Sequence, residues 1–141
     1  MANDFQLDDV LLQHAACLGQ TSLNYVLLAP HAEVQWFMLV PRTDAVELCD
    51  LPADIHDQLF SEAHHLGRAI RTRFNCDKLN VASIGNVVRQ LHLHVIGRYF
   101  SDPFWPNGMW GQPVGPTRSA AEIAEITRWL ESTFGNDFAV S

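Results

Sequence analysis

The sequence has little of what nucleic-acid-binding and membrane proteins contain. It has a single lysine, Lys78, beside eight arginines, and its net charge is -7 at pH 7. Such an acidic chain is a poor ligand for a phosphate backbone, which argues against nucleic acid as a partner. Phosphate in a small molecule stays open, because backbone N–H groups and imidazoles bind it without a basic surface. No apolar run approaches the ~20 residues that span a bilayer.

Cysteine is also scarce. Cys17, Cys49 and Cys76 are odd in number and widely spaced, and no Cys-x-x-Cys pair suggests a structural zinc or a redox motif. Reduced thiols in a cytoplasmic protein are the simplest interpretation. The N-terminal segment MANDFQLDD is acidic and lacks the basic and apolar parts of an export signal. We therefore expect a cytoplasmic protein with no membrane partner.

The length of 141 residues fits one domain, residues 1–141, in which 101–141 form a loop rich in tryptophan, proline and glycine and then a C-terminal helix. Apolar residues at helical spacing, together with capping residues, predict helices over residues 7–18, 52–74 and 119–134. Apolar runs between turn signals predict strands over residues 23–28, 34–40, 78–84 and 90–99. Helices and strands in this order favour an α+β fold, with an antiparallel sheet covered by helices.

The most informative segment is Gln90-Leu91-His92-Leu93-His94-Val95-Ile96, in which polar and aliphatic residues alternate. Side chains alternate between the two faces of a β-strand, so the pattern predicts that Gln90, His92 and His94 share one face. Two imidazoles and an amide would then lie in one patch.

Three interpretations of this patch compete. His-x-His on a strand is one way to bind a metal, but the nearest downstream acid, Asp102, stands eight positions after His94. In the second interpretation the two histidines are inert residues on the exposed face of an edge strand. In the third interpretation a neutral imidazole attacks phosphorus and forms a covalent phosphoramidate, which water then cleaves. This requires the remote ring nitrogen to be held as a donor, usually by a backbone carbonyl, and further donors for the phosphate oxygens.

The third interpretation coincides with a family resemblance. QLHLHVI resembles the signature of the histidine triad (HIT) family, in which three histidines alternate with apolar residues. LNVASIGNVVR resembles the segment that leads into that signature, and WFMLVPR resembles the family strand that ends in proline and a basic residue. DPFWPNGMWG is similar to the tail of a bacterial branch that carries QLH in place of HLH.

The resemblance implies a HIT-like α+β fold with an antiparallel sheet of about five strands, one long helix and shorter helices. It also implies a homodimer whose sheets join, and nucleotidyl hydrolase or transferase chemistry on a nucleoside phosphate. By this resemblance His92 is the nucleophile and His94 donates to the phosphate and the leaving group. Asn80 matches a phosphate-contacting amide, and Gly85 and Asn86 fall in the phosphate-binding turn.

The chain departs from the family pattern at several positions. Gln90 replaces the first histidine, where a glutamine is still able to orient its neighbour by a hydrogen bond. Trp36 and Asp44 lie near positions where relatives often have histidines. The strand 25–28 offers no carboxylate for ribose hydroxyls.

The loop tryptophans Trp105 and Trp110 have two interpretations. They either cover a nucleotide base or anchor the loop on the sheet.

Two functions follow for the chain as a whole. The first is a HIT-like hydrolase acting on a phosphoramidate, an anhydride or a dinucleoside polyphosphate through a phosphohistidine at His92. The second is a nucleotide-binding or signalling module with weak or no catalysis. Neither function requires a cofactor, although Mg²⁺ accompanies many substrate phosphates, and a metal-binding His-x-His protein is the third alternative.

Overall fold

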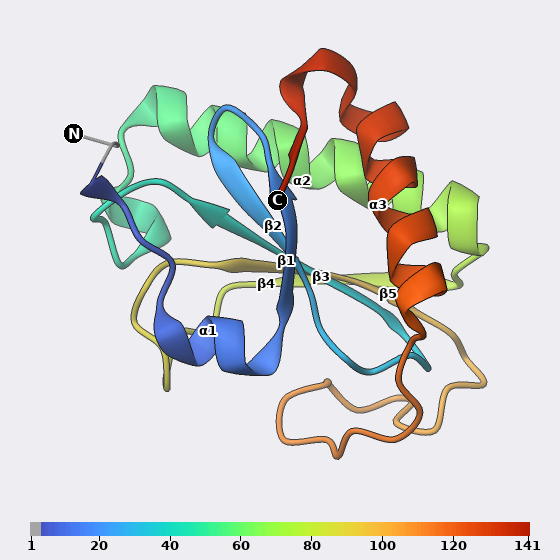
Figure 1. Cartoon of the computed structure of the whole chain (residues 1–141). Helices are drawn as coiled ribbons and strands as arrows, with labels where there is room; N and C mark the ends of the chain where they lie inside the picture. Colours follow the sequence, from blue (N-terminus) through green and yellow to red (C-terminus); the bar gives the residue numbers. More distant parts are fainter. Residues whose placement is uncertain (1–3) are drawn as a thin grey trace.

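The computed structural model describes residues 4–141 and is built around one antiparallel sheet (Figure 1). The six strands lie in the order β4-β5-β3-β2-β1-β6. Their bounds are β1 Ala16–Gln20, β2 Asn24–Leu28, β3 Gln35–Pro41, β4 Lys78–Ala82, β5 Leu93–Arg98 and β6 Ala139–Val140. The α+β class and the antiparallel sheet are confirmed. Two strands, β1 and β6, add to the four that the sequence predicts, which gives one strand more than the family resemblance implies.

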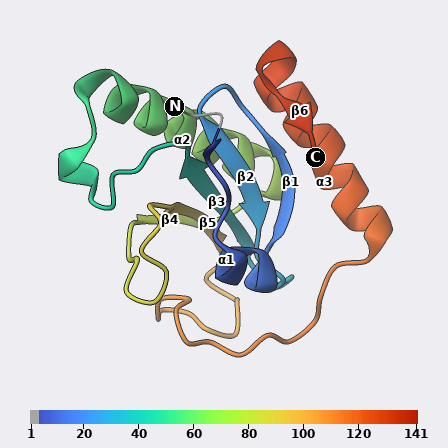
Figure 2. The ribbon, with the colours of Figure 1, turned by 60° about the vertical axis from the view of Figure 1, so that its left-hand side comes forward.

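Helices cover the two faces of this sheet unequally. The helices are α1 Asp9–His14, α2 Ala53–Phe74 and α3 Ala120–Phe134, with short 3-10 turns at Leu48–Asp50 and Gly135–Asp137. Figures 1 and 2 show α2 and α3 on one face and α1 with the loop before α3 on the other. No helix among residues 4–141 has the length and apolar character to cross a bilayer.

The face under α2 and α3 holds the larger core. Leu59, Leu66 and Ile70 of α2 and Leu130 of α3 are completely buried there, against Phe37 of β3. The apolar stripe of α2 therefore packs on the sheet as its three-to-four residue spacing predicts. Ser119 caps α3 in a reciprocal capping box with Glu122, which confirms the predicted start of that helix.

The predicted helix over residues 7–18 is wrong in its second half. The helix ends at His14, and β1 pairs with β2, with Cys17 opposite Leu27. Leu11 packs on the face of α1, whereas Leu18 packs in the core under α2. Because these two leucines lie on opposite faces of the sheet, one continuous helix cannot bury both of them.

The predicted strand 90–99 is wrong at its start. β5 begins at Leu93, and the residues between β4 and β5 form a long irregular loop, 83–92. His94 lies on the strand and His92 directly precedes it, while Gln90 lies outside the sheet. The alternation of polar and apolar residues already begins at Gln90, in the last three residues of this loop, so spacing alone does not reveal where the ladder begins.

The loop 99–107 is fastened to β5 by a buried ion pair. Arg98, which is 1 % exposed, donates from Nε and Nη2 to the two carboxylate oxygens of Asp102, at 2.9 and 3.0 Å. Asp102 also accepts from the backbone N–H groups of Tyr99 and Phe104. The only acid near the histidine motif in sequence is therefore occupied by an arginine.

Candidate functional site

The His92 ring is held in a single tautomer by the backbone. Its Nδ1 lies 2.7 Å from the carbonyl oxygen of Gln90. A carbonyl only accepts, so Nδ1 carries the hydrogen and Nε2 keeps a lone pair. Nε2 has no hydrogen-bond partner in the part of the chain that the structure describes. This is the arrangement that an imidazole nucleophile requires.

His94 is held in the opposite tautomer. The indole Nε1–H of Trp36 on β3 donates to His94 Nδ1 at 2.9 Å, so Nδ1 is an acceptor and Nε2 carries the hydrogen. Protonation of Nδ1 would break this bond. Burial and the nearby His92 ring lower the pKa of His94 to about 4, so that the ring stays neutral at pH 7. His94 therefore presents a neutral N–H donor.

Trp110, in the irregular loop before α3, lies against His94. Its ring meets the His94 ring edge-on at 5.5 Å, and its Nε1 lies 3.5 Å from His94 Nε2. Because both nitrogens carry hydrogen in the assigned tautomers, this approach is a contact without donation. The His92 and His94 rings lie 4.9 Å apart. The indole thus covers one side of His94, and the two neighbouring rings hold complementary groups, a lone pair on His92 and a donor on His94.

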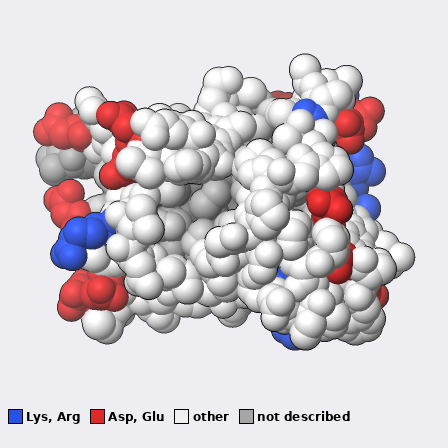
Figure 3. All heavy atoms as spheres, turned by 90° about the horizontal axis from the view of Figure 1, so that it is seen from below, with Lys and Arg blue, Asp and Glu red and all other residues white. Residues whose placement is uncertain are grey.

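A hollow on this face of the sheet lies beside the histidines. This cavity of about 600 Å³, which we call the apolar pocket, is enclosed by α1, β3, the loop before α3 and both histidines. Its wall contains no Asp, Glu, Lys or Arg. Figure 3 shows the same face, with a hollowed, uncharged middle and charged side chains at its margins. A flat apolar group is the occupant that such a wall favours.

A second, smaller cavity of about 290 Å³ also borders His92. We call it the arginine pocket, after Arg89. It lies between the loop 83–92 and the segment Val46–Cys49. His92 borders both pockets, whereas His94 borders only the apolar one. No three His, Cys, Asp or Glu side chains in residues 4–141 are grouped as metal ligands.

Comparison with known proteins shows the family to which the chain belongs. The family model of the HIT domain matches residues 12–101, which is more than half of the chain. The chain belongs to the histidine triad family. A search of curated proteins gave no match.

Solved HIT structures have the same fold over nearly their whole length. A histidine triad protein from Bradyrhizobium japonicum is 35 % identical, with a TM-score of 0.86 over 92 % of this chain and 98 % of the other. One from Marinobacter aquaeolei VT8 is 36 % identical, with a TM-score of 0.86 over 94 % and 98 %. One from Sinorhizobium meliloti 1021 is 27 % identical, with a TM-score of 0.88 over 94 % and 99 %. The resemblance read from the sequence is thereby confirmed.

Gln90 differs from its predicted arrangement in this HIT domain. Its side chain does not join the histidines: the amide oxygen accepts from Asp8 N at 2.9 Å and the amide nitrogen donates to Gln6 O at 2.8 Å. Gln90 thus fastens the segment before α1 to the loop before β5. Its main-chain carbonyl, not its amide, orients His92.

Of the three predicted phosphate-binding residues, only Gly85 lines a pocket that His92 borders. Asn80 lies on β4, and its amide oxygen accepts from Arg98 Nη1 at 3.0 Å. Gly85 lines the arginine pocket with a φ of 64°, a left-handed conformation that favours glycine at this turn. Asn86 is exposed and belongs to the wall of neither pocket.

The two loop tryptophans also differ in position. Trp105 packs on Phe100, with the ring centroids 5.0 Å apart, and the Arg98 guanidinium lies 5.5 Å from its ring centre. This contact fits the interpretation of an anchor for the loop. Trp110 is 39 % exposed and lies beside His94, the position of a cover over the site.

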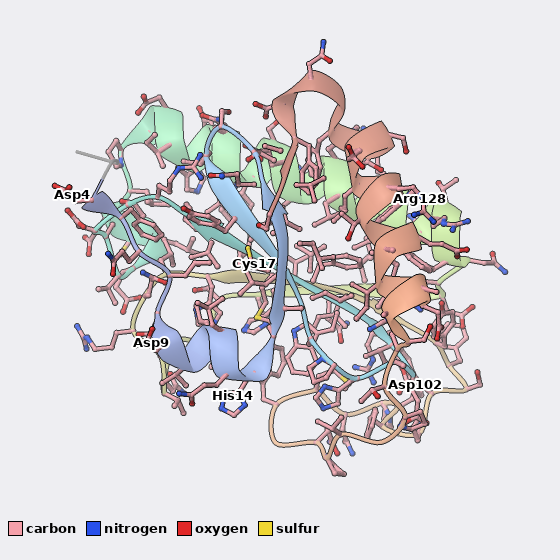
Figure 4. All side chains as sticks on the ribbon, viewed as in Figure 1. Asp4, Asp9, His14, Cys17, Asp102 and Arg128 are labelled. Carbon is pink, nitrogen blue, oxygen red and sulfur yellow. The ribbon has the colours of Figure 1, made fainter. Side chains whose placement is uncertain are left out.

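Sequence reasoning missed two histidines of the apolar pocket. His14 ends α1 and is labelled in Figure 4, and His31 lies in the turn between β2 and β3. His31 is buried, with Nε2 3.1 Å from the carbonyl oxygen of Gln112. Its Nδ1 has no partner in the described part of the chain. Neither residue stands in a periodic pattern, so the sequence offers no signal for either.

The low pKa of His94 predicts a loss of stability in weak acid. Unfolding returns the pKa from about 4 to 6.5, so the unfolded chain binds more protons between these values. Stability is therefore lost as the pH falls, by about 2 kcal/mol between pH 7 and pH 5. His94→Asn retains an acceptor for Trp36 but does not titrate. Urea unfolding should show that this variant loses less stability than the wild type between pH 7 and pH 5. An equal loss of stability would contradict the assignment of this effect to His94.

Proposed function

We propose that this HIT protein is a nucleotidyl hydrolase or transferase that acts on a small nucleoside phosphate. The substrate classes are phosphoramidates, anhydrides and dinucleoside polyphosphates. The observation that carries the proposal is the bond between His92 Nδ1 and Gln90 O, because it leaves a lone pair on Nε2 of a residue that borders two pockets. In this mechanism Nε2 attacks phosphorus to form a phosphohistidine, which water then cleaves.

His94 supports this mechanism as a hydrogen-bond donor. Its Nε2–H is fixed by the bond from Trp36, and it borders the same pocket as His92. A donor already oriented towards the phosphate oxygens stabilises the charge that they gain in the transition state. A neutral ring does this without a change of protonation at pH 7.

The apolar pocket is the proposed site of the nucleobase. Its wall combines aliphatic side chains with Trp36 and two methionines, Met38 and Met109. Such side chains pack against the faces of a flat ring. Hydrogen bonds are available from the imidazoles of His14 and His31 and from side-chain amides. No carboxylate in this wall is available for ribose hydroxyls.

The covalent intermediate gives the most direct test. The purified protein is mixed with a panel of nucleoside phosphoramidates, anhydrides and dinucleoside polyphosphates and quenched within the first turnover. Mass spectrometry of the peptides is expected to find a nucleotidyl group on His92. The absence of any adduct during confirmed turnover would contradict the covalent mechanism.

A binding module without efficient catalysis is the second candidate. The presence of Gln90 at the position of the first histidine favours it, because the amide is engaged with Gln6 and Asp8 rather than with the reacting groups. Calorimetric binding of AMP without turnover of any substrate in the panel would support this candidate over the enzyme.

Neither function needs a cofactor beyond Mg²⁺ carried by the substrate phosphates. A reducing compartment such as the cytoplasm suits the three cysteines, because Cys17, Cys49 and Cys76 are all unpaired.

The homodimer implied by the family would form at the edge of β4. This strand ends one side of the sheet, and apolar residues are exposed on it and on the following loop: Val81 at 45 %, Ile84 at 41 % and Val87 at 89 %. An open apolar edge is a template for pairing with another strand. Joining two copies there would extend the sheet.

Val81→Lys is expected to shift the dimer to monomer. The substitution places a charge among apolar side chains of the proposed interface. Light scattering after size exclusion measures the mass at several concentrations. Val140→Lys is the matched control, since Val140 is 50 % exposed on the opposite edge strand, β6. A wild-type monomer, or equal effects of both variants, would contradict the proposed interface.

A further inference from the structure

The arginine pocket contains a cation that is not engaged elsewhere. Arg89 and Glu47 are the two charged residues of its wall, and both are exposed. Arg89 forms no hydrogen bond or ion pair with residues 4–141. The guanidinium of Arg89 therefore keeps its donors available, and Arg89 borders a cavity that His92 also borders.

The other arginine side chains near the sheet are committed to the protein. Arg98 binds Asp102, Arg118 donates to the carbonyl oxygens of Ala29 and Val34, and Arg42 donates to Gln20. These three guanidiniums serve the fold. Arg89 differs, since it stands on an irregular loop and lines a hollow next to the nucleophile.

We propose that the arginine pocket binds an anionic leaving group, so that the preferred substrates are phosphoric anhydrides. The proposal rests on the proposed function and refines its substrate class. The base occupies the apolar pocket, the reacting phosphorus lies at His92, and a further phosphate extends to Arg89. Guanidinium groups suit this role, because their paired N–H donors match phosphate oxygens.

The transfer step balances without an added reagent. The lone pair of His92 Nε2 forms a bond to phosphorus, and the bond from phosphorus to the bridging oxygen breaks. That oxygen leaves with the electron pair as a terminal phosphate oxygen, whose negative charge Arg89 stabilises. Water then attacks phosphorus, the N–P bond breaks, and its electron pair returns to Nε2. A nucleoside monophosphate is released, and the proton of the water goes to solvent.

The fixed tautomer of His94 is consistent with an anhydride as the substrate. An amine leaving group needs a proton as the N–P bond breaks, whereas a phosphate departs as an anion. A general acid works best with a pKa near the working pH. The hydrogen bond from Trp36 occupies the nitrogen of His94 that would take up a proton, so His94 donates a hydrogen bond but is a poor proton source. A leaving group that needs no proton therefore suits this site.

Glu47 is the second charged residue of the arginine pocket, and its effect on phosphate binding should oppose that of Arg89. Its carboxylate lines the same pocket and would repel a phosphate, in opposition to Arg89. Both side chains are exposed, so both effects should weaken as salt screens them. Glu47→Gln is thus expected to increase turnover of an anhydride, while Arg89→Met decreases it.

Two substrates with the same nucleotidyl group separate the roles. Diadenosine triphosphate releases anionic ADP, whereas adenosine 5′-phosphoramidate releases ammonia. Arg89→Met should decrease kcat/KM for diadenosine triphosphate about 10-fold more than for the phosphoramidate. A difference of this size is expected when an exposed, charge-assisted contact is lost. Arg89→Lys should give an intermediate value, and 0.5 M salt should reduce the difference. Arg68→Met, on the exposed face of α2, is the matched control.

The outcomes distinguish this inference from the function on which it rests. Equal decreases in kcat/KM of Arg89→Met for both substrates would overturn the proposal of an anionic leaving group. A wild-type protein that turns over the phosphoramidate but not the anhydride would also overturn it. Either result would leave the proposed nucleotidyl transfer intact. If the wild type acts on neither substrate, the proposed function fails and this inference fails with it. If Arg89→Met does not fold, Arg89→Lys and Glu47→Gln still measure the charge effect, and unchanged anhydride turnover in both would overturn the proposal.

Discussion

Replacing His92 with alanine is expected to decrease nucleotidyl turnover by at least about 1,000-fold, the scale on which enzymes lose rate without their nucleophile. The substitution removes the lone pair on Nε2 that the carbonyl of Gln90 keeps available. A fluorogenic adenylyl phosphoramidate, tested beside diadenosine triphosphate, measures the loss with both kinds of leaving group. The adduct on the His92 peptide should disappear in parallel.

His64→Ala is the control for this experiment. His64 lies exposed on α2, on the other face of the sheet, and should retain wild-type rates. Binding of AMP should persist in His92→Ala, because the wall of the apolar pocket remains. Activity of His92→Ala equal to that of the wild type would refute the assignment of His92 as nucleophile.

Replacing Arg98 with methionine is expected to destabilise the fold by about 3–5 kcal/mol, the usual cost of leaving one partner of a buried ion pair alone. Arg98 and Asp102 have side chains that are 1 % and 0 % exposed. Methionine fills part of the volume but leaves the Asp102 carboxylate without its cation. Urea unfolding at a fixed protein concentration measures the loss, and Arg128→Met on the exposed side of α3 is the control (Figure 4).

The pH dependence identifies the ion pair as the cause. Burial alone would raise the pKa of Asp102, but the hydrogen bonds from Arg98 and from two backbone N–H groups outweigh it and lower the pKa. The stability from this pair is therefore present above the ordinary carboxyl pKa and is lost as the pH falls. The difference between the wild type and Arg98→Met should shrink in acid. A constant difference would assign the effect to packing alone.

Periodicity predicted the elements whose apolar residues all lie on one face. The long helix α2 and the capped helix α3 are examples, since Leu66 and Leu130 each belong to a stripe that packs on the same sheet. The prediction of one helix over residues 7–18 failed because Leu11 and Leu18 pack on opposite faces of the sheet. Spacing along a chain does not indicate that the backbone passes from one side of a sheet to the other.

The site was predictable only where the chain itself carries the pattern. His92 and His94 belong to one short motif and do lie together, with their rings 4.9 Å apart. Trp36, His31 and Arg89 come from a strand, a turn and a loop, and only the tertiary fold assembles them around those rings. The sequence indicated the chemistry that we propose for His92 but not the two pockets that His92 borders.

The orientation of His92 has a consequence for how members of this family are recognised. A main-chain carbonyl is present whatever side chain stands at position 90, so the tautomer of His92 does not depend on the identity of that residue. The side chain at that position is then free to take on another task, here to fasten Gln6 and Asp8. Search patterns that demand three histidines would therefore discard chains whose reactive nitrogen is held in place by the backbone alone.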